Sequence, residues 1–156
     1  MAIWYTDQGR TFGTRIGQGI GRQRLTATAI VAMTTTMLDN ADDEVSLFWL
    51  PKGAVVTGIT AMGTDMDSGA AALVFDIGDD GDEDRLMAAT TIGQAGTLSN
   101  TLAVTGFLYK YTADTRIKCY TKVAAATAVA GTLTIAVDYF VDPEFSTTAI
   151  AASTTL

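Results

Sequence analysis

Residues 115–123 read Thr115-Arg116-Ile117-Lys118-Cys119-Tyr120-Thr121-Lys122-Val123. Neighbouring side chains differ in polarity with a period of 2, which is the pattern of a β-strand with one buried face. The inward set is Ile117, Cys119, Thr121 and Val123, and the outward set is Arg116, Lys118, Tyr120 and Lys122. A surface helix would need a period near 3.6, so this stretch favours an all-β protein.

The same period recurs along most of the chain. We expect strands over 25–34, 44–50, 54–62, 71–77, 85–92, 103–111 and 132–141 as well. Val45, Leu47 and Trp49 share one face of their strand, and so do Phe107, Tyr109 and Tyr111 of theirs. Segments 93–100 and 124–130 are expected loops. About eight strands separated by turn signals predict a single jelly-roll-like antiparallel β-sandwich.

Charge divides the chain of 156 residues into unequal parts. The first 24 residues carry a net charge of +3, and the remaining residues carry −10. Residues 1–24 are also rich in glycine and show no regular pattern, so we expect an extended N-terminal arm. Residues 25–142 form the expected sandwich body, and 143–156, rich in Ser, Thr and Ala, form a flexible C-terminal tail unless a partner holds it.

The residue inventory argues against an enzyme. The chain has no histidine and a single cysteine, Cys119, so neither a disulfide nor a Ser-His or Cys-His pair can form within it. Cys119 is expected to be a small buried hydrophobe. A carboxylate pair, as in glycosidases, is the catalytic arrangement that stays open, because a sequence does not give the distance between two carboxylates. We expect no cofactor, no secretion signal and no membrane span, since no run approaches ~20 apolar residues.

Two short segments resemble binding loops. Asp76-Ile77-Gly78-Asp79-Asp80-Gly81-Asp82-Glu83-Asp84 has the carboxylates and glycines of a calcium loop, but Gly78 and Met87 stand where an EF-hand needs ligands. A solvated hairpin tip is the favoured interpretation, and calcium stays the alternative. Gly17-Gln18-Gly19-Ile20-Gly21 lacks the sixth-position glycine of a dinucleotide loop, so we reject a phosphate site.

The arm is the candidate binding element. Its aromatic and branched side chains are too many for a purely solvating linker, so it is expected to pack on a partner. The candidate contact residues are Trp4, Tyr5, Arg10, Phe12, Arg15, Ile16, Arg22 and Arg24. Nucleic acid is disfavoured because the acidic body would repel a polyanion, and a protein with an acidic groove suits the arm better. Trp49 and Phe48 are assigned to packing rather than to a sugar-stacking platform.

Several stretches resemble a known family. They are Leu50-Pro51-Lys52-Gly53-Ala54-Val55-Val56-Thr57-Gly58-Ile59, Leu73-Val74-Phe75-Asp76-Ile77-Gly78, Gly81-Asp82-Glu83-Asp84-Arg85-Leu86 and Leu133-Thr134-Ile135-Ala136-Val137-Asp138-Tyr139. Together they are similar to the decoration, or cement, proteins of tailed bacteriophages, over roughly residues 44–141.

The resemblance implies a specific function. It implies a jelly-roll viral structural protein on the outer surface of an HK97-type capsid, which stabilises the shell by cross-linking subunits of the major capsid protein. It also implies a homo-oligomer, with a trimer favoured over a dimer, made in the host cytoplasm. Neither the arm nor the tail contributes to the resemblance. The alternative is a head or tail fibre module that binds surface glycans.

Overall fold

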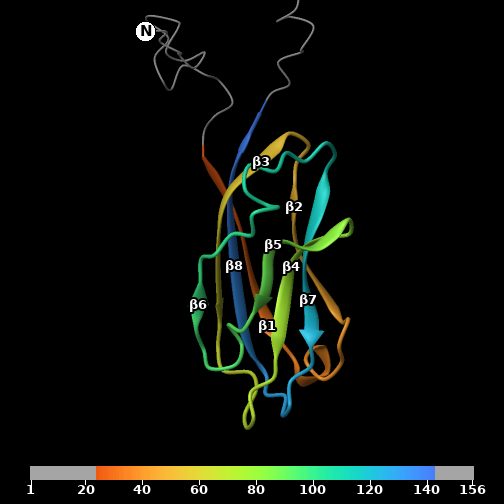
Figure 1. Cartoon of the computed structure of the whole chain (residues 1–156), viewed down its shortest axis with the longest axis vertical. Helices are drawn as coiled ribbons and strands as arrows, with labels where there is room; N and C mark the ends of the chain where they lie inside the picture. The colour runs from red at the N-terminus through yellow and green to blue at the C-terminus, as the bar shows by residue number, and fades with distance from the viewer. Residues whose placement is uncertain (1–23, 143–156) are drawn as a thin grey trace, which may run out of the picture.

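The computed structural model describes residues 24–142, which form a β-sandwich (Figure 1). One sheet has the order β1-β8-β3-β6, with β1 Leu25–Met33, β8 Gly131–Val141, β3 Ala54–Gly63 and β6 Leu98–Ser99. The other has the order β2-β7-β4-β5, with β2 Glu44–Leu50, β7 Thr115–Val123, β4 Val74–Asp79 and β5 Asp82–Thr90. A 3-10 turn, η1, spans Thr35–Met37. No helix in the described part is long and apolar enough to cross a membrane.

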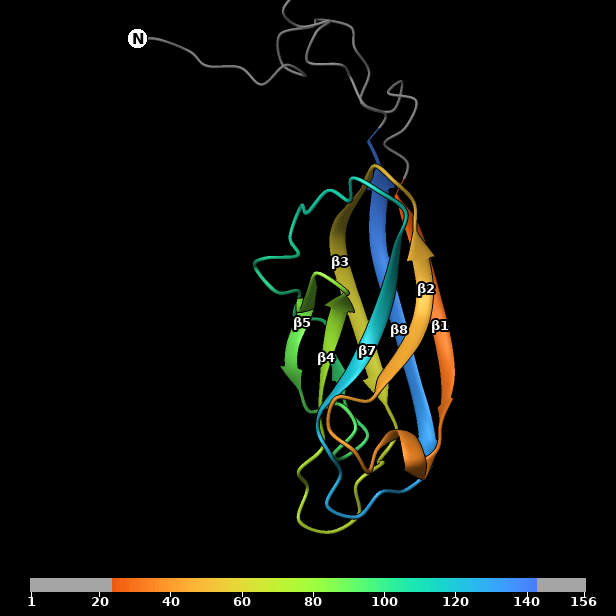
Figure 2. The same ribbon diagram turned by 90° about the vertical axis from the view of Figure 1, so that its right-hand side faces the viewer.

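The connectivity is that of a jelly roll. The first strand pairs with the eighth, the second with the seventh, the third with the sixth and the fourth with the fifth, always antiparallel. Such pairing arises when one long hairpin is rolled into two facing sheets, which Figure 2 shows as two layers. The predicted jelly-roll-like sandwich is therefore confirmed.

Alternating residues fill the space between the sheets. Ile117 and Cys119 of β7 face Leu133, Ile135 and Val137 of β8, and none of these five side chains is more than 1% exposed. Burial raises the pKa of the Cys119 thiol, so it stays protonated. The inward faces predicted for β7 and β8 are confirmed at these positions.

The predicted strand over 103–111 is wrong. The sixth strand is only Leu98–Ser99, inside the segment expected to be a loop, and it pairs with Ala61 and Met62 of β3. Residues 103–111 instead cross the open edge of the sandwich as irregular chain. Gly106 lies so close to β5 that a Cβ there would be 2.4 Å from the Arg85 carbonyl oxygen. This contact, together with a left-handed Leu108 (φ 58°), prevents a regular strand.

A β-bulge in β2 reverses the predicted orientation of Trp49. The pairing of β2 with β7 shifts between Ser46 and Phe48, so the residues after the shift change face. Phe48 and Leu50 turn toward the core, while Trp49 turns outward and is 57% exposed. The prediction that Trp49 shares a face with Val45 and Leu47 is wrong for this reason.

Candidate interaction surfaces

The candidate arm residues Trp4, Tyr5, Arg10, Phe12, Arg15, Ile16 and Arg22 lie outside the described residues, and so does the tail 143–156. The division into arm, body and tail therefore stays a prediction. Only Arg24 is described. Its guanidinium donates to the carboxylate of Asp138 on β8, while Thr26 Oγ1 donates to the other oxygen of that carboxylate at 2.6 Å. The hydrogen bond from Thr26 and the Arg24 cation lower the pKa of Asp138. This ion pair ties the first described residue to the outer face of β8.

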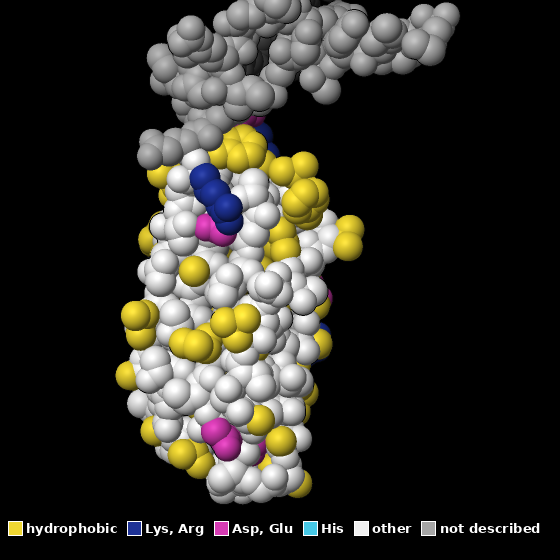
Figure 3. All heavy atoms as spheres, turned by 90° about the vertical axis from the view of Figure 1, so that its left-hand side faces the viewer, with side chains coloured by type: hydrophobic (Ala, Val, Ile, Leu, Met, Phe, Trp, Pro, Cys, Tyr) yellow, Lys and Arg dark blue, Asp and Glu magenta, His cyan; other side chains and the backbone are white. Residues whose placement is uncertain are grey.

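The outer face of the β1-β8-β3-β6 sheet is almost free of charge. Its outward side chains include Thr28 and Ile30 on β1, Thr134 on β8 and Met62 on β3, and Ile30 is 73% exposed. Figure 3 shows this side of the molecule with few charged groups among uncharged and apolar ones. Such a face can be covered by a partner without the cost of desolvating ions.

The outer face of the opposite sheet is charged and internally paired. Lys118 Nζ lies 2.7 Å from Glu44 Oε2 and also contacts Asp80, and these two carboxylates raise the pKa of Lys118. Lys122 Nζ lies 2.8 Å from Asp76 Oδ2. The Arg116 guanidinium lies 4.9 Å from the centre of the Trp49 ring, so this exposed aromatic ring is already stacked.

The acidic segment 76–84 is mostly strand, and only its tip is a turn. Asp76 meets Lys122 on the outer face and accepts the backbone N–H of Ala89. Asp79 is turned the other way, toward the buried Tyr111. Within residues 24–142 no cluster of His, Cys, Asp or Glu is arranged to hold a metal ion. The carboxylates of Asp76 and Asp79 are thus used in the fold, and their geometry gives the calcium hypothesis no support.

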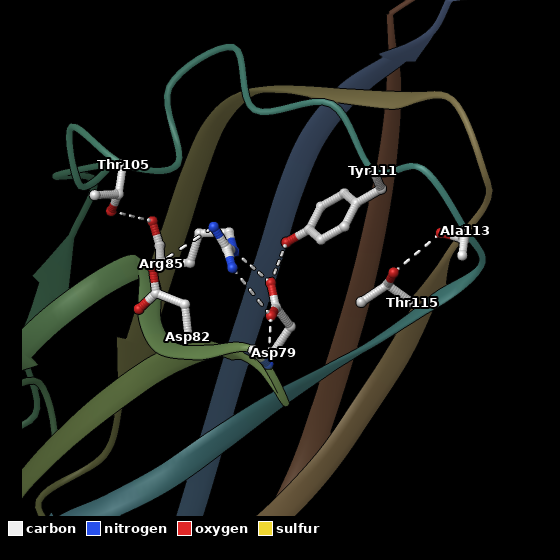
Figure 4. A network of polar contacts seen from close by, with 8 residues as sticks. Asp79, Asp82, Arg85, Thr105, Tyr111, Ala113 and Thr115 are labelled. Atoms are coloured by element: carbon white, nitrogen blue, oxygen red, sulfur yellow. Dashed lines mark hydrogen bonds and ion pairs between the residues drawn. The ribbon is translucent and has the colours of Figure 1, made fainter.

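Asp79 centres a buried polar network that holds the irregular segment in place (Figure 4). Arg85 Nε donates to Asp79 Oδ2 at 2.6 Å, and Tyr111 Oη donates to the same oxygen at 3.2 Å. The Arg85 guanidinium also stacks on Tyr109, 4.0 Å from the ring centre. Burial raises the pKa of Tyr111, and the Asp79 carboxylate adds to the shift. The network joins the β4–β5 hairpin to residues 103–111.

An uncharged edge is the surface that the sequence analysis missed. All residues from 86 to 109 lack charge, the longest such run in the chain. The run supplies residues 86–90 of β5, all of β6 and residues 103–109 of the irregular segment, and Val104, Phe107 and Leu108 are 93%, 60% and 54% exposed. The absence of any charge over 24 residues was the available signal. The alternating side chains of 103–111 predicted a strand there instead.

Solved structures share this architecture, although no protein-family model and no curated protein sequence matches the chain. A chain of the capsid asymmetric unit of cyanophage Pam1 is 30% identical and superposes with a TM-score of 0.73, over 88% of this chain and 98% of that one. This chain belongs to a family of bacteriophage capsid proteins.

Two further phage capsids contain the same fold. A chain of the Ralstonia phage GP4 capsid is 23% identical, with a TM-score of 0.64, over 80% of the phage capsid protein described here and 88% of its own length. A chain of the acid-stable capsid of Helicobacter pylori phage KHP30 is 15% identical, with a TM-score of 0.54, over 78% and 90% of the two chains. At these identities the likeness shows the fold alone.

Proposed function

We propose that this phage capsid protein is a decoration protein. It binds the outer surface of an HK97-type capsid and stabilises the shell by cross-linking subunits of the major capsid protein. The observation that carries the proposal is the similarity to the Pam1 capsid chain over 98% of that chain, which matches the whole jelly roll rather than one motif. The role is structural, and we propose no catalytic activity.

The charge distribution supports binding through the arm. Residues 1–24 carry +3 on a chain whose remainder carries −10, so an acidic groove on a capsid subunit would attract the arm and repel the body. The ion pair between Arg24 and Asp138 gives the arm a fixed origin at the end of β1. A 23-residue arm spans up to ~75 Å when extended, enough to lie across a neighbouring subunit. Within the arm, Trp4, Tyr5, Phe12 and Ile16 supply the apolar contacts and the arginines the ion pairs.

Assembly into a homo-oligomer multiplies weak contacts. A trimer, which the family resemblance favours over a dimer, carries three arms to one site on the shell. Each further arm then binds as an intramolecular event at high effective concentration. Cross-linking by simultaneous binding is the proposed mechanism, and it requires neither a cofactor nor nucleic acid nor a membrane.

Co-sedimentation with capsids tests the proposal. Heads of the same phage that lack this protein are mixed with the full chain or with a variant lacking residues 2–23, which keeps Arg24 and its ion pair with Asp138. The full chain is expected to pellet with the heads, and the truncated chain to stay in solution with an unchanged melting temperature. Equal pelleting of both chains would show that capsid binding does not need the arm. If neither chain pellets with the heads, capsid binding is rejected.

A further inference from the structure

A groove runs along the open edge of the sandwich. β5 and β6 are the edge strands of their sheets at the same side, and each pairs with a strand on one flank only. Between them lies a cavity of about 480 Å³, lined by residues that include Met87, Ala88, Thr97, Leu98 and Thr101. Edge strands with free backbone groups are the usual sites at which an extended peptide adds to a sheet.

The edge of the first sheet is incomplete along the middle of β3. β6 covers only Ala61 and Met62 of β3, and residues 108–111 cover only 54–56 through bonds such as Val56 N–H to the Tyr109 carbonyl at 3.1 Å. Among the described residues no strand pairs with 57–60 on this flank. The position of the sixth strand is therefore filled at its ends and left open in the middle.

The uncharged lining of the groove favours a peptide segment without charged side chains. No charged side chain lines it, and Leu98 stands 60% exposed at its rim. The N-terminal arm, with its arginines, would bring cations to a surface without carboxylates. Residues 145–156 have no charged side chain and contain Thr, Ile and Phe, which favour strands. They read Phe145-Ser146-Thr147-Thr148-Ala149-Ile150-Ala151-Ala152-Ser153-Thr154-Thr155-Leu156.

The exit of the chain from β8 favours the groove of another molecule. Asp142 precedes Pro143, which restricts Asp142 to extended backbone. Asp142 is also fixed to its own body by its N–H bond to the Gly53 carbonyl and by Lys110, 3.1 Å away. Figure 1 shows β8 ending at the tip of the sandwich, whereas β5 and β6 lie along its side.

We propose that the β5–β6 groove of one copy binds residues 145–156 of a second copy as an added strand. The tail leaves β8 and the groove lies at the β5–β6 edge, so the contact is head-to-tail and joins two different surfaces. Head-to-tail contacts close into rings when the rotation allows, which is how a trimer would form. This exchange involves neither the arm nor the capsid, so it stands or fails independently of the proposed capsid binding.

Cross-linking of full-length chains tests the exchange directly. One variant carries Ala88→Cys at the exposed rim of the groove and another carries Ala149→Cys in the tail. The native Cys119 is 1% exposed and does not compete. Under mild oxidation the mixed variants are expected to form a disulfide-linked heterodimer. The matched control pair is Ala149→Cys with Thr28→Cys, an exposed position on β1 at the opposite edge, and it is expected to give none.

Each remaining outcome overturns the proposal. A bond that forms only within a single chain carrying both Ala88→Cys and Ala149→Cys would place the tail in its own groove. Equal cross-linking of Ala88→Cys and Thr28→Cys would show no preference for this edge, and no cross-link at all would leave the groove without this occupant.

Native mass spectrometry gives a second, independent readout. A lysine in the groove, Ala88→Lys, or a charge in the tail, Ile150→Asp, is expected to convert the oligomer to monomer without changing the melting temperature of the body. Thr28→Lys, on the opposite edge, is expected to leave the oligomer intact. An oligomer that survives both groove and tail variants would overturn the exchange.

Discussion

Asp67 shows how single residues hold the loops at the end of the sandwich away from the termini. It is 2% exposed, and its carboxylate accepts backbone N–H groups of Ala72, Leu73 and Thr127 at 2.6, 2.9 and 2.9 Å. These bonds join the loop after β3 to the loop before β8 (Figure 2). Burial alone would raise the pKa of Asp67, but the backbone donors outweigh it and lower the pKa to about 2.

The sign of this shift predicts acid sensitivity. The pKa is lower in the folded state than the ~3.9 of an unfolded aspartate, so Asp67 stabilises the protein above pH ~4 and loses that contribution as pH falls toward 2. We expect Asp67→Asn to lower the free energy of unfolding at pH 7 by about 2 kcal/mol and to flatten its pH dependence between 4 and 2. Urea denaturation across this range measures both. Glu83→Gln, at an exposed position, is the control and should change neither.

At the scale of elements, the close approach of Gly106 to β5 positions the irregular segment. Ala103 N–H donates to the Leu86 carbonyl at 2.9 Å, and Thr105 Oγ1 donates to the Arg85 carbonyl at 3.2 Å. A side chain at position 106 would meet the Arg85 carbonyl and the Leu86 Cδ2 atom, 3.2 Å away, so the backbone would have to move. The segment that carries the exposed Val104 and Phe107 therefore depends on this glycine.

We expect Gly106→Ala to displace the segment and to destabilise the protein by about 2 kcal/mol, the usual cost of overpacking. Hydrogen exchange should become faster at the Ala103 amide, and the melting temperature should fall. Val104→Ala in the same segment removes a side chain that is 93% exposed, and it should change neither quantity. An unchanged exchange rate in Gly106→Ala would show that the segment does not rest on this contact.

The acidic segment of the β4–β5 hairpin gives a prediction about calcium binding. Because Asp76 and Asp79 point to opposite sides of β4 and already have cationic partners, we expect no change in melting temperature at millimolar calcium. A rise in melting temperature that magnesium does not reproduce would contradict this assignment and restore the loop hypothesis.

The elements that the sequence predicts well are those with one face toward the core. In β7 and β8 the core residues Ile117 and Ile135 stand next to Lys118 and Thr134, which lie on the outer faces of their sheets. β6 is not predicted because a strand of two residues is too short to show an alternating pattern. Tyr109 and Tyr111 mimic a strand, although they pack edge to face, 5.0 Å apart, over an irregular backbone. A bulge one residue long reverses Trp49, and nothing in the local pattern marks it.

The candidate site was only partly accessible from the sequence. Charge asymmetry pointed to the arm, but composition cannot say what the arm contacts. The groove depends on which strands lie at the edges, which is a property of the sheet order and hence of long-range pairing. Partners for Asp76 and Asp79 come from β7 and β5, so their internal roles could not be inferred from the acidic run itself.

For the molecule as a whole, the separation of charge predicts a salt-dependent interaction with the capsid. Ion pairs between exposed groups weaken as ionic strength rises, because the screening length shortens to ~3 Å at 1 M. We expect capsid affinity of the full chain to fall with added salt, and the combined change Arg10→Gln, Arg15→Gln and Arg22→Gln to weaken binding and flatten this dependence. Sedimentation at several salt concentrations measures it.

A charge-matched control distinguishes the arm from net charge. Lys110→Gln, Arg116→Gln and Lys122→Gln remove the same charge from the body, where each cation contacts an acidic or aromatic neighbour. This variant should keep the salt dependence of the full chain. A loss of capsid binding equal to that of the arm variant would assign the effect to overall charge.

The position of the sandwich on the virion tests the central claim most directly. In a cryo-EM reconstruction of the phage that encodes this protein, we predict density for the jelly roll of residues 24–142 on the outside of the shell, with residues 1–23 continuing from β1 across adjacent capsid subunits. A sandwich on the inner surface, or one whose first 23 residues touch no capsid subunit, would contradict the account.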